Sequence, residues 1–240
     1  PRKALQHART SVAAGRHGRV VSRDPGDLGR HPASTRAWRR SHDRGHLHRW
    51  LLHSTKKWGL TLSCPTETLR ALAAARITHV VGIPDNTSAP LFDALGDHPS
   101  ITLVTATREG EAIAVAAGLW LGGAAPLIVI QNTGLLESGD SLRGTASRMG
   151  AAVPMLITGR GYAKMAKAGI TPDEPRTRAF LTRPDVDTTA PLTEPTLDAW
   201  GIPFERCEEE EYAAATILRA IESARTEERP TAAIIACPLN

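Results

Sequence analysis

The sequence lacks any long apolar run. No stretch approaches the roughly 18 consecutive apolar residues that a membrane-spanning helix needs. It is also poor in cysteine, with Cys64, Cys207 and Cys237 far apart in a chain of 240 residues. These three form neither a disulfide framework nor a CxxC pair, so we expect a reducing, cytoplasmic location and no membrane association.

Motifs of several common enzyme classes are missing as well. No GxxxxGK[ST] loop occurs, and Gly159-x-Gly161 has Lys164 where the dinucleotide fingerprint GxGxxG needs its third glycine. No serine lies in a GxSxG elbow, and only His79 and His98 follow residue 60 as candidate catalytic histidines. These absences argue against Rossmann, P-loop and serine-hydrolase functions.

Residues 1–60 contain no glutamate, and their three aspartates stand against 14 Lys and Arg. Residues 61–240 hold 15 basic and 22 acidic residues, so the formal net charge of +4 averages two unlike segments and does not indicate nucleic-acid binding. The first sixty residues show no sustained apolar period and cannot bury enough surface to offset chain ordering. We interpret them as a basic, disordered or non-native N-terminal extension; a nucleic-acid-binding arm and a targeting segment are the alternatives.

Residues 61–240 alternate between strand and helix patterns. Short β-branched apolar runs predict six strands, at 77–83, 101–106, 126–131, 154–158, 203–207 and 231–236. The runs between them predict helices, among them 65–76, 109–121, 138–149, 194–200 and 209–225. This alternation is typical of an α/β domain with a six-stranded parallel sheet and helices on both faces. We expect residues 160–191 to form a long irregular loop, either a lid or a solvated surface segment.

Ligands of open parallel sheets bind beyond the carboxyl ends of the strands. Segments 82–86, 107–111, 131–134 and 159–161 fall there. Glu109 begins a helix whose residues are small on nearly every face, so a flat ring or a second helix can approach closely. A carboxylate in that position suits a ring nitrogen, although Glu109 and Glu111 would serve equally well as helix-start acids.

Residues 66–240 resemble the pyrimidine-binding domain of thiamine diphosphate enzymes, most closely phosphonopyruvate decarboxylases and the α subunits of sulfopyruvate decarboxylases. The resemblance is carried by GIPDN (82–86), TREGEAIAVAAG (107–118), QNTGL (131–135), ITGRG (157–161), DEP (173–175) and LDAWGIPF (197–204). In these enzymes the catalytic glutamate precedes a helix glycine by nine positions. Glu109 and Gly118 meet that spacing, whereas Glu111 does not.

The resemblance implies that Glu109 is the catalytic residue and hydrogen-bonds N1′ of the aminopyrimidine of thiamine diphosphate. The implied reaction converts 3-sulfopyruvate or 3-phosphonopyruvate, 2-oxo acids with an anionic tail, into an aldehyde and CO2. The implied cofactor-binding residues are Pro84, Glu109, Gln131, Asn132, Thr133 and Gly134. Asp85, Asn86 and Arg160 are the implied substrate residues, and a sulfonate or phosphonate tail needs cationic or N–H donors.

The sequence departs from the family in two motifs. The usual QNSGLGN becomes QNTGLLE, so that Leu136 and Glu137 replace Gly and Asn and add bulk and charge near the cofactor. The usual DEPQH becomes DEPRT at 173–177. A non-catalytic relative that acts only as a partner subunit is therefore the alternative function.

The motif through which the family holds metal and diphosphate, GDG followed by a distant Asn, is also absent. Gly139-Asp140 lacks the second glycine, and no asparagine lies between Asn132 and Asn240. Mg2+ needs a set of hard oxygen ligands that this chain does not offer. We therefore expect no metal site here and a separate β subunit that supplies Mg2+ and diphosphate binding, in an α2β2 or higher hetero-oligomer with helix 109–121 facing another subunit.

Overall fold

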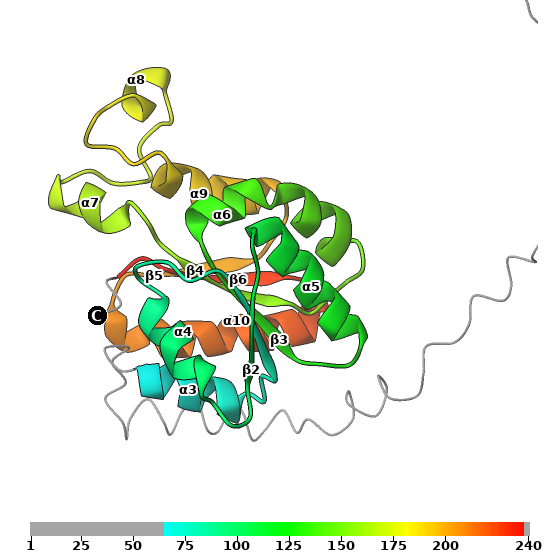
Figure 1. The fold of residues 1–240 in the computed structure, drawn as a ribbon. Coiled ribbons are helices and arrows are strands. Elements are labelled where there is room, and N and C mark those ends of the chain that lie inside the picture. The colour runs from blue at the N-terminus through cyan, green and yellow to red at the C-terminus, as the bar shows by residue number, and fades with distance from the viewer. Residues whose placement is uncertain (1–64, 238–240) are drawn as a thin grey trace, which may run out of the picture.

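The computed structural model of the chain describes residues 65–237, and the interpretation of residues 1–60 lies outside this part. Six strands form one sheet in the order β2-β1-β3-β4-β6-β5, and every neighbouring pair is parallel (Figure 1). They are β1 (His79–Gly82), β2 (Thr102–Thr105), β3 (Pro126–Gln131), β4 (Pro154–Thr158), β5 (Phe204–Cys207) and β6 (Thr231–Ile235). The predicted six-stranded parallel sheet is confirmed.

Helices cover both faces of the sheet. Successive residues of a strand point to opposite faces, so neighbouring side chains pack against different helices. Val80 packs with the layer of α3 (Pro65–Ala74), α4 (Ala89–Gly96) and α10 (Ala213–Glu227). Val81 packs with the layer of α5 (Glu109–Leu121), α6 (Asn132–Glu137), the π-helix η1 (Ser141–Ser147) and α9 (Thr189–Ala199). A 3-10 turn, η2 (Glu210–Tyr212), leads into α10. None of the helices between residues 65 and 237 is long and apolar enough to cross a membrane.

The order of connections places the topological switch point of the sheet between β1 and β3. The chain passes from β1 to β2 on one side and then returns to β3 on the other, so the carboxyl ends of β1 and β3 flank the point where ligands of such sheets bind. Gly82 ends β1 there, and a Cβ atom on it would lie 1.9 Å from the carbonyl oxygen of Val129. Only glycine therefore allows the two strands to meet in this register.

The helix predicted over 138–149 is present as a π-helix at 141–147, but the helix that precedes it was not predicted. Helix α6 begins at Asn132, directly after β3, and the π-helix η1 follows it. The Ser138 hydroxyl, which ends α6, donates to the carbonyl oxygens of Gly134 (2.8 Å) and Leu135 (3.1 Å). Such back-bonding competes with a continuous ladder and favours a break at that residue.

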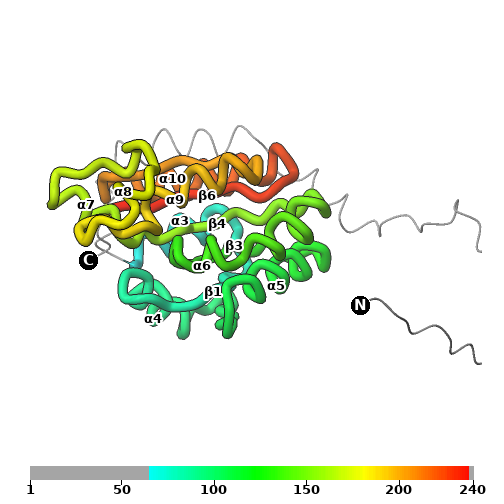
Figure 2. The backbone as a smooth tube through the Cα atoms, turned by 90° about the horizontal axis from the view of Figure 1, so that it is seen from above, coloured from blue at the N-terminus to red at the C-terminus, as the bar shows by residue number. Residues whose placement is uncertain are grey.

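The segment 160–191 is also more ordered than predicted. It holds two short helices, α7 (Tyr162–Lys167) and α8 (Arg178–Leu181), and α9 already begins at Thr189. Tyr162, Met165 and Phe180 are buried in the core layer beside α9. In Figure 1, α7 and α8 lie at one end of the domain and α8 projects from it, and Figure 2 shows the same end from above. Its few apolar anchors are too widely spaced to give a helical period in the sequence.

Candidate active site

Glu109 is the first residue of α5, and its side chain lies against Gly134 in α6. A Cβ atom on Gly134 would lie 2.1 Å from Cγ and 2.3 Å from Cδ of Glu109. Gly134 is buried, whereas Glu109 keeps part of its surface exposed. The missing side chain at Gly134 thus creates the space in which the Glu109 carboxylate sits, beside the end of β3.

The two acids in the first turn of α5 have different surroundings. Glu111 accepts hydrogen bonds from the Thr107 backbone N–H (2.9 Å) and from its hydroxyl (2.6 Å), and these bonds lower the pKa of Glu111. No described residue donates a hydrogen bond or forms an ion pair with the Glu109 carboxylate. Glu111 therefore serves as the helix-start acid, and Glu109 keeps a carboxylate free for a ligand.

Glu137 lies at the end of α6 and reaches back to the start of α5. It forms an ion pair with Arg108, and its Oε2 accepts a hydrogen bond from the Gly110 backbone N–H at 3.1 Å. The bond from Arg108, followed by that from Gly110, lowers the pKa of Glu137. The charge that this motif departure adds is thus neutralised within the protein.

Asn132 has a structural task that the sequence did not reveal. It is fully buried. Its amide nitrogen donates to the carbonyl oxygen of Arg160 (3.0 Å) and to the Thr193 hydroxyl (3.1 Å), while its oxygen accepts from the Arg160 N–H (3.1 Å). The side chain therefore ties the ends of β3 and β4 to α9, and a side-chain bond to a cofactor would compete with these contacts.

Asp85 also has its oxygens occupied. Oδ1 accepts from the backbone N–H groups of Thr87 (2.6 Å) and Ser88 (2.9 Å), which fixes the turn into α4. Oδ2 accepts from the hydroxyl of Thr158 at 2.5 Å. Thr158 is buried at the end of β4 and was missed by the sequence analysis. The carboxyl ends of β1 and β4 are joined in this way, and the substrate role of Asp85 stays a prediction.

The remaining predicted residues lie along the same rim. Thr133 donates from its hydroxyl to the Gln131 side-chain oxygen at 3.0 Å, and Gln131 is half-buried. Pro84 and Asn86 are exposed in the turn after β1. The fold therefore brings residues 84–86, 109 and 131–134 to the same carboxyl edge of the sheet, as the motif order predicts.

Arg160 follows β4, and its side chain is 59% exposed. Its Nε lies 3.2 Å from Oδ2 of Asp187, while its backbone is held by Asn132. Gly161, the next residue, has φ +91°, a conformation that favours glycine. Arg160 thus combines a fixed backbone with a guanidinium group that solutes can reach.

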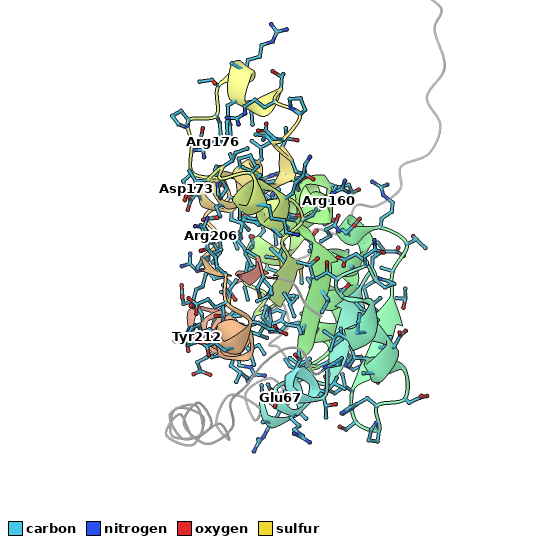
Figure 3. All side chains as sticks on the ribbon, turned by 90° about the vertical axis from the view of Figure 1, so that its left-hand side faces the viewer. Glu67, Arg160, Asp173, Arg176, Arg206 and Tyr212 are labelled. Carbon is cyan, nitrogen blue, oxygen red and sulfur yellow. The ribbon has the colours of Figure 1, made fainter. Side chains whose placement is uncertain are left out.

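A cluster around Arg206 on β5 was not predicted. Its guanidinium group forms ion pairs with Glu194 (2.6 Å), Glu208 (3.0 Å) and Asp173 (3.5 Å) and lies 5.9 Å from the ring centroid of Tyr162. Asp173 belongs to the DEP motif, and Figure 3 shows it on the same side of the domain as Arg206. This cluster links the projecting segment to the edge of the sheet.

Comparisons with known sequences agree with this geometry. A family model described as thiamine pyrophosphate enzyme, N-terminal TPP binding domain, matches residues 67–174. Phosphonopyruvate decarboxylase of Streptomyces viridochromogenes is 39% identical over 69 residues, which cover 29% of this chain and 17% of the relative. Phosphonopyruvate decarboxylase of Streptomyces hygroscopicus is 39% identical over 70 residues, which cover 29% of this chain and 18% of the relative. The matches thus span less than a fifth of these relatives.

Solved structures share the fold. The thiamine diphosphate-dependent 4-hydroxybenzoylformate decarboxylase of Rhodococcus jostii RHA1 matches with a TM-score of 0.53 and 17% identity, over 75% of this chain and 30% of its own. A putative thiamin diphosphate-dependent enzyme from Mycobacterium smegmatis matches with a TM-score of 0.52 and 22% identity, over the same shares. The motifs, the sheet order and the match over residues 67–174 together identify the described residues as a pyrimidine-binding domain of the N-terminal thiamine pyrophosphate enzyme type, similar to the matching part of phosphonopyruvate decarboxylases.

Proposed function

We propose that this chain is the α subunit of a thiamine diphosphate-dependent decarboxylase that acts on a 2-oxo acid with an anionic tail. The observation that carries the proposal is the carboxylate of Glu109, which has no partner among the described residues and lies over Gly134 at the switch point of the sheet. The relatives named phosphonopyruvate decarboxylase support the reaction class.

The described residues fit one half of the coenzyme. The Glu109 carboxylate, which fills the space over Gly134 and has no partner among the described residues, suits the aminopyrimidine ring, which offers a nitrogen for hydrogen bonding. We propose that another subunit holds the metal and diphosphate half; between residues 65 and 237, no group of three or more His, Cys, Asp or Glu lies together in a way that could hold a metal ion. Pro84, Gln131 and Thr133, on the exposed rim, are the further residues proposed to contact the ring.

Glu109 acts by binding a ring nitrogen and holding a proton there, as a positioned acid–base group does. The coenzyme, when bound, supplies the electron sink for decarboxylation. Asp85 and Asn132 hold the surrounding strand ends together through part-buried hydrogen bonds. The protein's proposed share of the chemistry is the half-buried carboxylate of Glu109 beside these strand ends.

The substrate tail is proposed to meet Arg160. Its exposed guanidinium group stands at the end of β4 on a backbone fixed by Asn132, and guanidinium groups pair well with phosphonate and sulfonate oxygens. Asn86, exposed in the turn after β1, offers a further amide donor. Both 3-phosphonopyruvate and 3-sulfopyruvate carry a tail of this kind, and they remain the two proposed substrates.

A separate β subunit is proposed to complete the site with Mg2+ and diphosphate binding, in an α2β2 or higher hetero-oligomer. The outward face of α5 supports this arrangement, because Ala114 and Gly118 are exposed there and Leu121 is 51% exposed. Small residues let a second subunit approach the helix backbone closely. This face begins at the same end of α5 as Glu109, so that a neighbour bound to it could share the site.

The test is co-expression of the full chain with a candidate subunit that carries the diphosphate motif, followed by decarboxylation assays with both substrates. Glu109→Gln should lower kcat by about 10²- to 10⁴-fold, the usual contribution of a positioned acid–base group. Glu111→Gln is the matched control, since its side chain still accepts from Thr107, and it should stay active. Unchanged turnover in Glu109→Gln would favour the non-catalytic alternative instead.

A further inference from the structure

The residues on both sides of Glu109 bond to the same partner. Arg108, whose side chain is 74% exposed, pairs with Glu137, and the Gly110 N–H donates to Oε2 of Glu137. Glu109 itself, between them, has no such bond among the described residues. The Glu137 carboxylate therefore binds both the guanidinium group of Arg108 and the backbone N–H of Gly110, the two residues next to Glu109 in the sequence.

This arrangement contributes little to stability. Ion pairs with exposed side chains are worth about 0–1 kcal/mol, because water already solvates both charges. Its effect on Glu109 is more specific. An arginine released from Glu137 would have Glu109 and Glu111 as neighbouring carboxylates. Its charge already contributes to lowering the pKa of Glu111, which also accepts from Thr107, whereas Glu109 has no partner among the described residues. The free N–H group of Gly110, in the first turn of α5, would likewise seek an acceptor.

We propose that Glu137 is a positioning residue: it holds Arg108 and the Gly110 N–H away from Glu109 and so leaves that carboxylate free for the pyrimidine ring. The inference rests on the proposed function. It gives a role to the acidic residue at position 137, where the resembled family has asparagine. A neutral amide could accept the Gly110 bond, but it could not neutralise Arg108.

Three variants of the full chain test the proposal, each with its partner subunit, thiamine diphosphate and Mg2+. Glu137→Gln keeps the size of the side chain and removes its charge, so Arg108 is released. It should weaken thiamine diphosphate binding, measured by calorimetry, by about two- to fivefold, the range of an exposed ion pair. Arg108→Gln should bind as the wild type does, and the double variant Arg108→Gln/Glu137→Gln should regain wild-type affinity.

A purely structural role for Glu137 predicts another pattern. In that case Arg108→Gln and Glu137→Gln would both weaken binding, and the double variant would not recover. Equal affinity in the wild type and Glu137→Gln would also overturn the proposal. Thermal melting of all variants shows whether each one folds.

A second measurement needs no coenzyme. In the 13C-glutamate-labelled chain, the carboxyl resonance of Glu109, assigned with Glu109→Gln, should shift in Glu137→Gln and return in the double variant. An unchanged resonance would overturn the inference. If the wild-type complex binds no thiamine diphosphate, the proposed function fails, and the resonance still reports whether Arg108 moves to Glu109.

Discussion

The side chain of Glu109 occupies the space that a side chain on Gly134 would fill. The three atoms nearest to a Cβ atom on Gly134 would be Cγ, Cδ and Oε1 of Glu109. All three belong to a flexible side chain rather than to backbone. The fold can therefore accept a methyl group at position 134 by rotating Glu109, whereas the site cannot.

Gly134→Ala should separate stability from function. We expect the free energy of unfolding to change by less than about 1 kcal/mol, since only a side chain has to move. Coenzyme-dependent turnover should fall by about 10²-fold, because small displacements of a catalytic group are costly. Urea unfolding and a decarboxylation assay of the complex measure the two effects.

Two other glycine-to-alanine variants serve as controls for Gly134→Ala. At Gly96 a Cβ atom meets nothing within 4 Å, so Gly96→Ala should leave both properties unchanged. At Gly82 it would meet the backbone oxygen of Val129 at 1.9 Å, so Gly82→Ala should unfold the sheet edge and lose stability together with activity. If Gly134→Ala behaved like Gly96→Ala in the assay, Glu109 would not be the group that matters.

Asn132→Ala should be strongly destabilising. It removes the partners of the Arg160 backbone groups and of the Thr193 hydroxyl at a fully buried position, and unpaired buried polar groups cost about 1–3 kcal/mol each. The midpoint of urea unfolding should fall accordingly. Thr182→Ala is the control, since its hydroxyl bonds only within an exposed turn of α8. Similar midpoints for the two variants would contradict the structural task assigned to Asn132.

The thiol of Cys207 should react as a thiolate near neutral pH. A hydrogen bond from Cys237 is the main cause that lowers the pKa of Cys207, from 9.0 to about 7, against the opposing effect of burial. In a Cys64→Ser background, the alkylation rate of Cys207 by iodoacetamide should rise through pH 7, because only the thiolate reacts. Site-resolved mass spectrometry follows the rate.

Cys237→Ala removes that hydrogen bond. The pH at which Cys207 reacts at half its maximal rate should then move upward, toward the ordinary thiol value. Burial of Cys207 slows alkylation at every pH and also raises its pKa, but it acts in both proteins, so it does not account for a difference between their midpoints. A midpoint that stays the same in Cys237→Ala would show that the two thiols do not interact.

Arg206→Leu should loosen the projecting segment. Removing the guanidinium group releases Asp173 and leaves Glu194 and Glu208 without their cation. Limited proteolysis should then cut faster between residues 168 and 188. Arg219→Leu is the control: it removes an ion pair to Glu205, which lies on β5 beside Arg206, and this pair does not involve the projecting segment. The segment of this variant should be cut at the wild-type rate. Equal cutting of the two variants would show that Arg206 does not anchor the segment.

Local pattern was enough to predict most of the fold. Runs such as Leu127 to Ile130 are apolar and bounded by turn residues, so they indicate buried strands. The choice of Glu109 over Glu111 rested on the glycine spacing of the resembled family and stays a prediction. Local pattern could not predict the hydrogen bonds that join the carboxyl ends of the strands. Asp85 and Thr158 lie 73 positions apart, and nothing local to either residue marks the pairing. Helix α6 was missed because Thr133-Gly134 resembles a loop until the sheet behind it is known.

The double hold of Asn132 on the Arg160 backbone has a consequence for how specificity can change. The buried side-chain amide of Asn132 holds the backbone of Arg160 in the loop after β4. The Arg160 side chain is 59% exposed and takes no part in these two bonds. If Arg160 meets the substrate tail as proposed, exchanging this side chain would change which acid is accepted while the backbone after β4 keeps its shape.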